Sequence, residues 1–280
     1  TPWLAAATPM LLTLLSKGLT VGPCVPCPRT ANSRCACTCY MAADGALSDE
    51  HLSELLEHRF VRISHYISDD LVSGLVADIR GLCDSAPSTD AMSAHGSQRL
   101  IHFGPGGVSS GQRPLPDEGG NPAARARLVE LVAGLKSSIE DAVGTGFDAD
   151  WTELQYGYYP NGGWYHRHVD SGSMGMTHPA LQPGQMIKRA CSFVLYLNQG
   201  WSPADGGHLR VYESKAMDAA YLDVEPEAGS IVVFKSDEVM HEVMPTSAER
   251  FAVIGWFNSV LSSPAEAERQ WAPQRPELMV

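Results

Sequence analysis

The chain lacks two features that mark membrane and nucleic-acid proteins. It has no apolar run of the roughly 20 residues that a membrane-spanning helix needs, because the run from Trp3 to Leu15 is shorter and is interrupted by Pro9. It is also poor in basic residues, with 20 Lys and Arg against 32 Asp and Glu and a net charge of -12. A nucleic-acid or anionic-lipid surface needs clustered positive charge. We therefore expect neither nucleic acid nor a membrane as partner, and find no sequence signal for an oligomeric state.

Cysteine is scarce in the body of the chain. Beyond residue 40 only Cys83 and Cys191 occur among the 280 residues. Two dispersed cysteines in a chain of this size are typical of a reducing compartment. The composition therefore predicts a cytoplasmic protein, long enough to form one large domain with appendages.

Residues 1–43 differ in kind from the rest and are predicted to be a disordered or targeting tail. The first 40 residues contain five cysteines and no Asp or Glu. An acid-poor segment with an apolar run suggests a signal or transit peptide, so an organellar location is the alternative. The CxxC and CxCxC spacings also leave a zinc site open. A further interpretation is that the mature protein begins near Met41.

Residues 44–149 are predicted to form a helical support region. Ser48 and Ser68 each precede leucines at helical spacing, and Asn121 precedes Pro122, a favourable first helical residue. The stretch 84–122 between the second and third helices is rich in Ser, Gly and Pro, and we expect mainly loops there.

Residues 150–260 change to short runs of β-forming residues separated by turns. Eight such runs without intervening helices predict an α+β protein whose β-sandwich or barrel carries the early helices on its outside. The glycine turns at 205–207 and 227–229 are predicted hairpin connections, and residues 261–280 are a predicted C-terminal tail. The runs are WTELQYGYYP, WYHRHVD, ACSFVLYLN, GGHLRVYE, AYLDVEP, SIVVFKS, HEVMPTS and RFAVIGWFN.

The run WYHRHVD places His166, His168 and Asp170 on one face of an extended strand. A cupin-type HxH site would need a glutamate a few residues on, and none follows. The other interpretation takes His168 and Asp170 as two corners of a 2-His-1-carboxylate facial triad, which needs a distant histidine on another strand. His241 is the candidate for that third ligand.

Such a triad leaves three positions of an octahedral ferrous ion open, enough for a bidentate 2-oxo acid and dioxygen. If the co-substrate is 2-oxoglutarate, its far carboxylate must meet a buried cation. Arg250 lies nine residues after His241 and offers a bidentate donor fork. Tyr196 and Tyr159 lie in neighbouring β-runs and offer phenolic hydroxyls.

These motifs, from YYPNGGWYHRHVD to ERFAVIGWF, resemble those of the Fe(II)/2-oxoglutarate-dependent dioxygenases of the prolyl 4-hydroxylase superfamily. Residues 150–258 are most similar to the hypoxia-inducible factor (HIF) prolyl hydroxylases and their bacterial and protist relatives. The resemblance implies a double-stranded β-helix, or jelly-roll, barrel with supporting N-terminal helices.

The resemblance also implies roles and partners. The cofactors and co-substrates would be Fe(II), 2-oxoglutarate, O2 and L-ascorbate, with succinate and CO2 released, and the substrate would be a proline in an intracellular protein or peptide. The implied roles are iron ligation by His168, Asp170 and His241, a salt bridge from Arg250 to 2-oxoglutarate, a bond from Tyr196 to the same carboxylate, proximity of Tyr159 to the co-substrate, and a pocket wall at Trp256.

Two features depart from that family, and one residue of the motif keeps no role in it. Ile254 stands where the animal oxygen sensors have threonine, and residues 171–188 form a longer loop, which we expect at the rim of the site with an exposed His178. His166 keeps no metal role and is expected near the mouth of the site or in the structure around it.

There are three alternatives to an intracellular prolyl hydroxylase. The chain could hydroxylate another residue or a free amino acid, since an iron site does not encode proline. It could also be a metal-binding barrel without turnover. A secreted collagen-type enzyme conflicts with Arg250, because those enzymes use a lysine one position later.

Overall fold

The computed structural model describes residues 45–85, 89–93, 96–103, 119–144, 146–147, 152–171 and 181–262. The tail predicted at 1–43, His178 in the expected rim loop and nearly all of the predicted C-terminal tail lie outside the described residues. Residues 40–280 form one compact unit. Within the described part, none of the helices combines the length and the apolar character needed to cross a bilayer.

Three predicted helices are present, and each begins at its predicted cap. The side chains of Ser48, Ser68 and Asn121 accept hydrogen bonds from the backbone N–H three residues on, at 3.2–3.3 Å. These bonds satisfy donors that a first helical turn leaves free. The helices are α2 (Asp49–His58), α3 (Asp69–Ser85) and α4 (Pro122–Val143).

All eight predicted β-runs form strands, as does the stretch after α2, β1 (Phe60–Ile63). The expectation of mainly loops at 84–122 was wrong in part, because a hairpin of β2 (Thr89–Ser93) and β3 (Gly96–Phe103) lies there. The eight are β4 (Glu153–Tyr159), β5 (Tyr165–His168), β6 (Met186–Tyr196), β7 (Leu209–Tyr212), β8 (Tyr221–Val224), β9 (Ile231–Lys235), β10 (Met240–Val243) and β11 (Arg250–Leu261).

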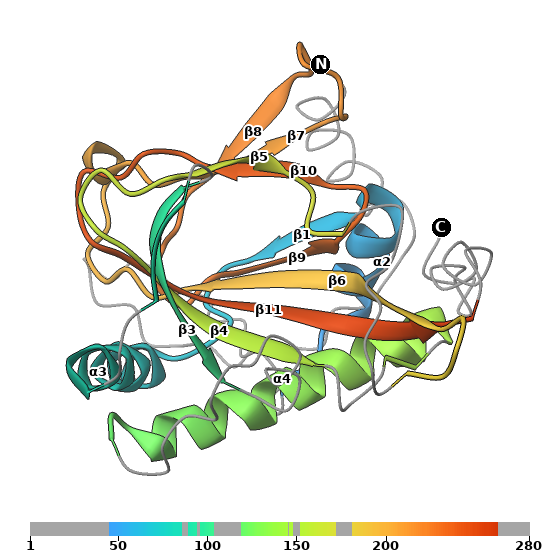
Figure 1. Cartoon of the computed structure of the whole chain (residues 1–280), viewed down its shortest axis with the longest axis horizontal. Coiled ribbons are helices and arrows are strands. Elements are labelled where there is room, and N and C mark those ends of the chain that lie inside the picture. The colour runs from blue at the N-terminus through green and yellow to red at the C-terminus, as the bar shows by residue number, and fades with distance from the viewer. Residues whose placement is uncertain are drawn as a thin grey trace, which may run out of the picture. The chain divides into compact units, whose positions relative to one another are not determined.

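The strands run in the order β1-β9-β6-β11-β4-β3-β5-β10-β7-β8 and curl into two facing layers. The larger layer ends at β3, and the smaller one, β5-β10-β7-β8, lies opposite it (Figure 1). Only the pair Gly96 and Tyr165 joins β3 to β5. Helices α3 and α4 cover the outer face of the larger layer, which is the predicted α+β arrangement.

The prediction that the two glycine turns connect hairpins was wrong. Gly206 and Gly207 do adopt positive φ angles of 63° and 71°, as turn residues do. However, the turn after β6 leads to β7, which pairs with β10 and β8, and the turn at 227–229 leads from β8 to β9, which pairs with β1 and β6. Both are therefore crossovers between layers, not hairpins.

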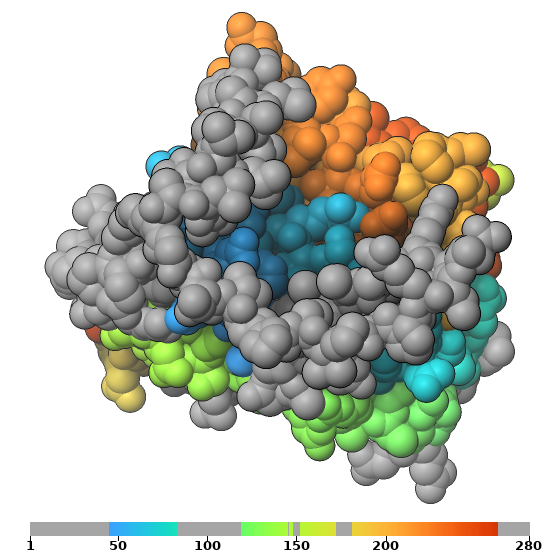
Figure 2. Space-filling model, turned by 180° about the vertical axis from the view of Figure 1, so that it is seen from behind, coloured from blue at the N-terminus to red at the C-terminus, as the bar shows by residue number. Residues whose placement is uncertain are grey.

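Two hydrophobic cores follow from the alternation of side chains along the strands. On β6, Phe193 and Leu195 face the helices in one core, whereas Val194 and Tyr196 face the smaller layer in the other. Seen from behind, the hairpin region of β7 and β8 (orange) projects at the top and α4 (green) lies at the bottom (Figure 2).

A buried carboxylate ties two helices to the larger layer. Asp78 on α3 is fully buried, and Arg125 on α4 donates to both of its oxygens at 2.7 and 2.9 Å. The Tyr156 hydroxyl on β4 donates to it at 2.6 Å, and the backbone N–H of Asn121 at 2.5 Å. The carboxylate therefore fixes how α3, α4 and β4 pack together.

Asp78→Asn is expected to lower the free energy of unfolding by about 3 kcal/mol, because it leaves the Arg125 guanidinium without its counter-charge. Urea unfolding followed by circular dichroism measures this change. The control Arg127→Gln, in an exposed pair with Glu130, should cost under about 1 kcal/mol. Equal effects of the two substitutions would contradict a structural role for Asp78.

Candidate functional site

A cavity of about 430 Å³ lies between the two layers. Its lining combines titratable side chains with an apolar wall, which is the usual composition of a small-molecule site. The residues from the smaller layer and its flanks are Tyr165, His166, His168, Val169, Asp170, Leu209, His241 and Val243, and those from the larger layer are Gln155, Tyr159, Arg189, Val194, Arg250, Ile254 and Trp256.

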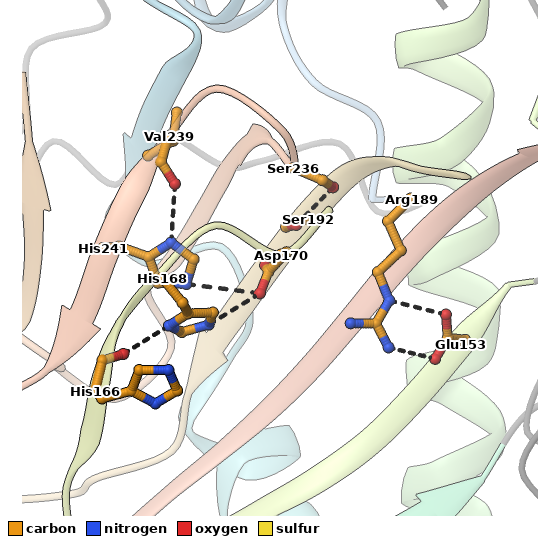
Figure 3. A network of polar contacts seen from close by, with 9 residues as sticks. All are labelled: Glu153, His166, His168, Asp170, Arg189, Ser192, Ser236, Val239 and His241. Carbon is orange, nitrogen blue, oxygen red and sulfur yellow. Dashed lines mark hydrogen bonds and ion pairs between the residues drawn. The ribbon is translucent and has the colours of Figure 1, made fainter. Parts of the chain in front are cut away.

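His168, Asp170 and His241 converge at one point of this cavity (Figure 3). His168 on β5 and His241 on β10 are direct register partners, and Asp170 follows β5 by two residues. Asp170 Oδ1 lies 3.2 Å from His168 Nε2 and 3.7 Å from His241 Nε2. One potential ligand atom from each residue lies within 4.8 Å of the others. This spacing can hold a metal ion in the facial arrangement typical of non-haem Fe(II).

The backbone orients both imidazoles toward that point. His168 Nδ1 donates to the carbonyl of His166 at 2.7 Å, and His241 Nδ1 donates to the carbonyl of Val239 at 3.1 Å. A proton held on Nδ1 leaves the Nε2 lone pair free for a metal. Phe234 contacts the His241 ring edge-on at a centroid distance of 4.8 Å and limits its rotation.

The protonation states also suit metal binding. Burial would raise the pKa of Asp170, but the adjacent imidazoles of His241 and His168, together with Arg189, hold it below its usual value. Burial lowers the pKa of His241, which Asp170 only partly offsets. An ionised carboxylate and a neutral imidazole are the forms that ligate metals.

Arg250, the first residue of β11, places a cation deeper in the cavity. It is 2% exposed. Its Nε donates to the carbonyl of Gly207 at 2.9 Å, while neither terminal nitrogen has a hydrogen-bond partner among the described residues. A buried guanidinium with free donors is costly unless an anion joins it. A carboxylate is the anion that its fork fits.

Two tyrosines flank this guanidinium. Its central carbon lies 4.7 Å from the ring centroid of Tyr159 and 5.3 Å from that of Tyr196. The Tyr196 hydroxyl is buried and likewise has no partner among the described residues. Burial raises the pKa of Tyr159 to about 12, with Arg250 opposing the rise. Both phenols therefore stay protonated and can donate.

A second cation also lines the cavity, and it was not predicted from the sequence. Arg189 donates to both carboxylate oxygens of Glu153 at 2.8 and 3.0 Å and stacks on the Trp256 ring at 3.7 Å. Strict alternation along β6 would turn Arg189 toward the helices. A bulge opposite Phe257 and Asn258 shifts the register and turns it inward. The β-run contains no sequence signal for that bulge.

The remaining predicted residues fall in two groups. His166, Ile254 and Trp256 line the cavity. Ile254 presents an apolar surface, and Gly157 on the adjacent strand β4 makes room for it, since a Cβ there would lie 2.9 Å from the Ile254 Cδ1. His178 lies outside the described residues. Gln155 also lines the cavity, is 4% exposed, and was not among the predicted site residues.

Comparison with known proteins points to one enzyme family. Residues 154–258 match the family described as the 2OG-Fe(II) oxygenase superfamily. A hypoxia-inducible factor prolyl hydroxylase of Caenorhabditis elegans is 36% identical over 102 residues, 35% of this chain. The alignment spans 12% of that relative's length, so this chain corresponds to only a small part of that protein.

Solved structures extend the likeness to the fold. A prolyl-4-hydroxylase from Pseudomonas putida is 29% identical with a TM-score of 0.58, and the match covers 75% of this chain and 97% of the other. A prolyl hydroxylase from Trichoplax adhaerens, in complex with a HIF peptide fragment, is 19% identical with a TM-score of 0.56, covering 75% and 87%. These matches confirm the predicted double-stranded β-helix with supporting helices.

His241→Ala is expected to weaken Co(II) binding by at least about 100-fold, because it removes one of three ligands. His166→Ala is the matched control, since His166 lines the same cavity but lies outside the convergent triad. Anaerobic titration followed by Co(II) absorption measures both affinities. Retained binding in His241→Ala, or an equal loss in His166→Ala, would reject the triad as a metal site.

Arg250→Met is expected to weaken 2-oxoglutarate binding to the metal-loaded protein by about 2 to 5 kcal/mol, since a buried carboxylate loses its counter-charge. Calorimetric titration of the Mn(II)-loaded protein provides the measurement. Arg127→Met serves as the control, because Arg127 pairs with Glu130 on an exposed face of α4 and does not line the cavity. Undiminished affinity in Arg250→Met would contradict the anion site.

Proposed function

We propose that the protein is a 2-oxoglutarate- and O2-dependent prolyl 4-hydroxylase acting on a protein or peptide, since residues 154–258 match the 2OG-Fe(II) oxygenase superfamily. One observation carries the proposal. The convergent His168, Asp170 and His241 share a cavity with Arg250, whose terminal nitrogens have no hydrogen-bond partner among the described residues. The cavity thus offers one site for a metal ion and one for a carboxylate. These two sites match the two ends of a dicarboxylate that chelates the metal.

The charges of these residues complement those of Fe(II) and of the 2-oxoglutarate carboxylate. His168, Asp170 and His241 would ligate the metal, Arg250 would bind the far carboxylate of 2-oxoglutarate, and the Tyr196 hydroxyl would donate to the same carboxylate. Fe(II), when bound, supplies the activation of O2 that couples conversion of 2-oxoglutarate to succinate and CO2 with substrate hydroxylation.

Other residues of the cavity would orient the co-substrate and limit water. Tyr159, protonated and stacked near Arg250, would donate toward the co-substrate. Val194, Leu209, Val243 and Ile254 line the cavity with apolar surface. An apolar wall excludes water and strengthens the charge pairs inside.

The Arg189 side of the cavity suits a peptide. Its guanidinium is held flat against Trp256 by Glu153, so its position is fixed before substrate arrives. A fixed cation beside an aromatic face can donate to a backbone carbonyl while the ring packs on an apolar side chain such as proline. The relatives named as prolyl hydroxylases support this substrate class.

Two further expectations belong to the proposal. L-Ascorbate would sustain turnover by returning oxidised iron to Fe(II) after cycles without substrate. The cysteine-poor body favours the cytoplasm.

Anaerobic reconstitution with Fe(II) and 2-oxoglutarate, followed by O2, tests the function. We expect succinate in excess only with proline-containing peptides, and a mass gain of one oxygen located on proline. Succinate coupled to a gain on another residue or on a free amino acid would replace the substrate. Absence of succinate in every condition would reject turnover and leave a binding module.

Arg189→Leu is expected to raise the KM for the peptide by about 10-fold or more, while the KM for 2-oxoglutarate stays within about two-fold, because Arg189 faces the substrate side. Lys188→Met is the control, since the neighbouring Lys188 pairs with Asp237 and does not line the cavity. Steady-state kinetics measures both constants. An increase confined to 2-oxoglutarate would contradict the assignment.

A further inference from the structure

The outer face of the smaller layer carries a chain of contacts directly behind the metal triad. Side chains alternate along a strand, so the neighbours of the two inward histidines point outward. Arg167 is the neighbour of His168 on β5, and Glu242 is the neighbour of His241 on β10. Tyr212 on β7 contacts both of them.

Arg167 on β5 contacts both β7 and the loop that follows it. Its guanidinium stacks on the Tyr212 ring at 3.7 Å. Its terminal nitrogens donate to the backbone carbonyls of Met217 at 3.1 Å, Ser214 at 3.3 Å and Ala216 at 2.5 Å. Arg167 therefore binds β5 to the loop between β7 and β8.

Strand order makes this contact a bridge. Strand β10 pairs with β5 on one side and β7 on the other, so Arg167 reaches across β10 to stack on Tyr212. The Tyr212 hydroxyl donates to the Glu242 carboxylate on β10 itself. One tyrosine thus braces both strands that carry the histidines. We call Arg167, Tyr212 and Glu242 the outer brace.

Backbone pairing alone holds β5 loosely. Its register with β10 comprises two pairs, His241 with His168 and Val243 with Tyr165, with an irregularity between them. On its other side it meets β3 at a single pair. Lys215 adds a second tie near the site, donating at 2.7 Å to the carbonyl of Asp237 in the turn before β10.

We propose that the outer brace positions the metal ligands, with Tyr212 setting the separation of His168 and His241. The proposal rests on the metal site of the proposed function. Residues that orient ligands from behind typically change metal affinity 10- to 100-fold when removed, because the ligands then sample wrong geometries. Here the brace acts through the strands instead of bonding to an imidazole.

The test compares Co(II) binding to the full-length apoprotein across variants, with anaerobic titration and the ligand-field absorption spectrum as readouts. Tyr212→Leu, which removes both brace contacts, should weaken Co(II) binding by about 10-fold and alter the spectrum. Tyr212→Phe keeps the ring under Arg167 and should fall between Tyr212→Leu and wild type. Urea midpoints of the apoproteins separate a change of site from a loss of folding.

Tyr221→Leu is the matched control. Tyr221 lies on β8, and Arg210 stacks on it at 3.7 Å in the same way. Its ring meets the Tyr212 ring edge-on at a centroid distance of 6.0 Å, and among the described residues no ring or ion contact joins it to β5 or β10. We expect wild-type Co(II) affinity and spectrum in this variant, with a urea midpoint lowered about as far as that of Tyr212→Leu.

Three outcomes overturn the brace. Wild-type affinity and spectrum in Tyr212→Leu would do so, as would an equal weakening in Tyr221→Leu. If Tyr212→Leu does not fold, wild-type binding in both Tyr212→Phe and Arg167→Lys does the same. Failure of the wild-type protein itself to bind Co(II) removes the metal site of the proposed function, whereas normal wild-type binding with unaffected variants removes only the brace.

Discussion

The pairing of His168 with His241 across β5 and β10 is the contact on which the rest of the site depends. It sets the two ring centroids 4.3 Å apart and lets Asp170, two residues after His168, approach both rings. Because side chains alternate, a slip of one residue in either strand would exchange a histidine for its outward neighbour, Arg167 or Glu242. A strand of four residues therefore decides whether three ligands meet.

The cavity holds two charged groups whose partners within the protein are incomplete. The Asp170 carboxylate lies between the imidazoles of His168 and His241, and the two terminal nitrogens of Arg250 have no hydrogen-bond partner among the described residues. A metal ion at the triad and a carboxylate at Arg250 would complete these contacts, and the barrel holds both groups in place for them. The Asp78–Arg125 network, by contrast, is fully paired and fastens the supporting helices. Stability and binding are thus assigned to different faces of the larger layer.

Much of the architecture was predictable because local chemistry decides it. Ser48, Ser68 and Asn121 mark helix starts through their caps, and alternating β-formers mark the strands. The positions of His168, Asp170, His241 and Arg250 in one cavity followed from motif spacing, while their chemical roles remain predictions. Strand partners were not predictable, because Gly206 and Gly207 specify a turn but not which strands flank it. Arg189 was missed for a related reason, since the bulge that turns it inward arises from pairing with β11, which is far away in sequence.

Because of that bulge, the orientation of Arg189 does not depend on the length of the segment between Asp170 and β6. The inward turn of Arg189 is produced within β6, after the segment that links β6 to Asp170. The linking segment can therefore gain or lose residues without rotating Arg189 out of the cavity. A change in the length of that segment, by evolution or by design, would then leave the orientation of Arg189 toward the cavity unchanged.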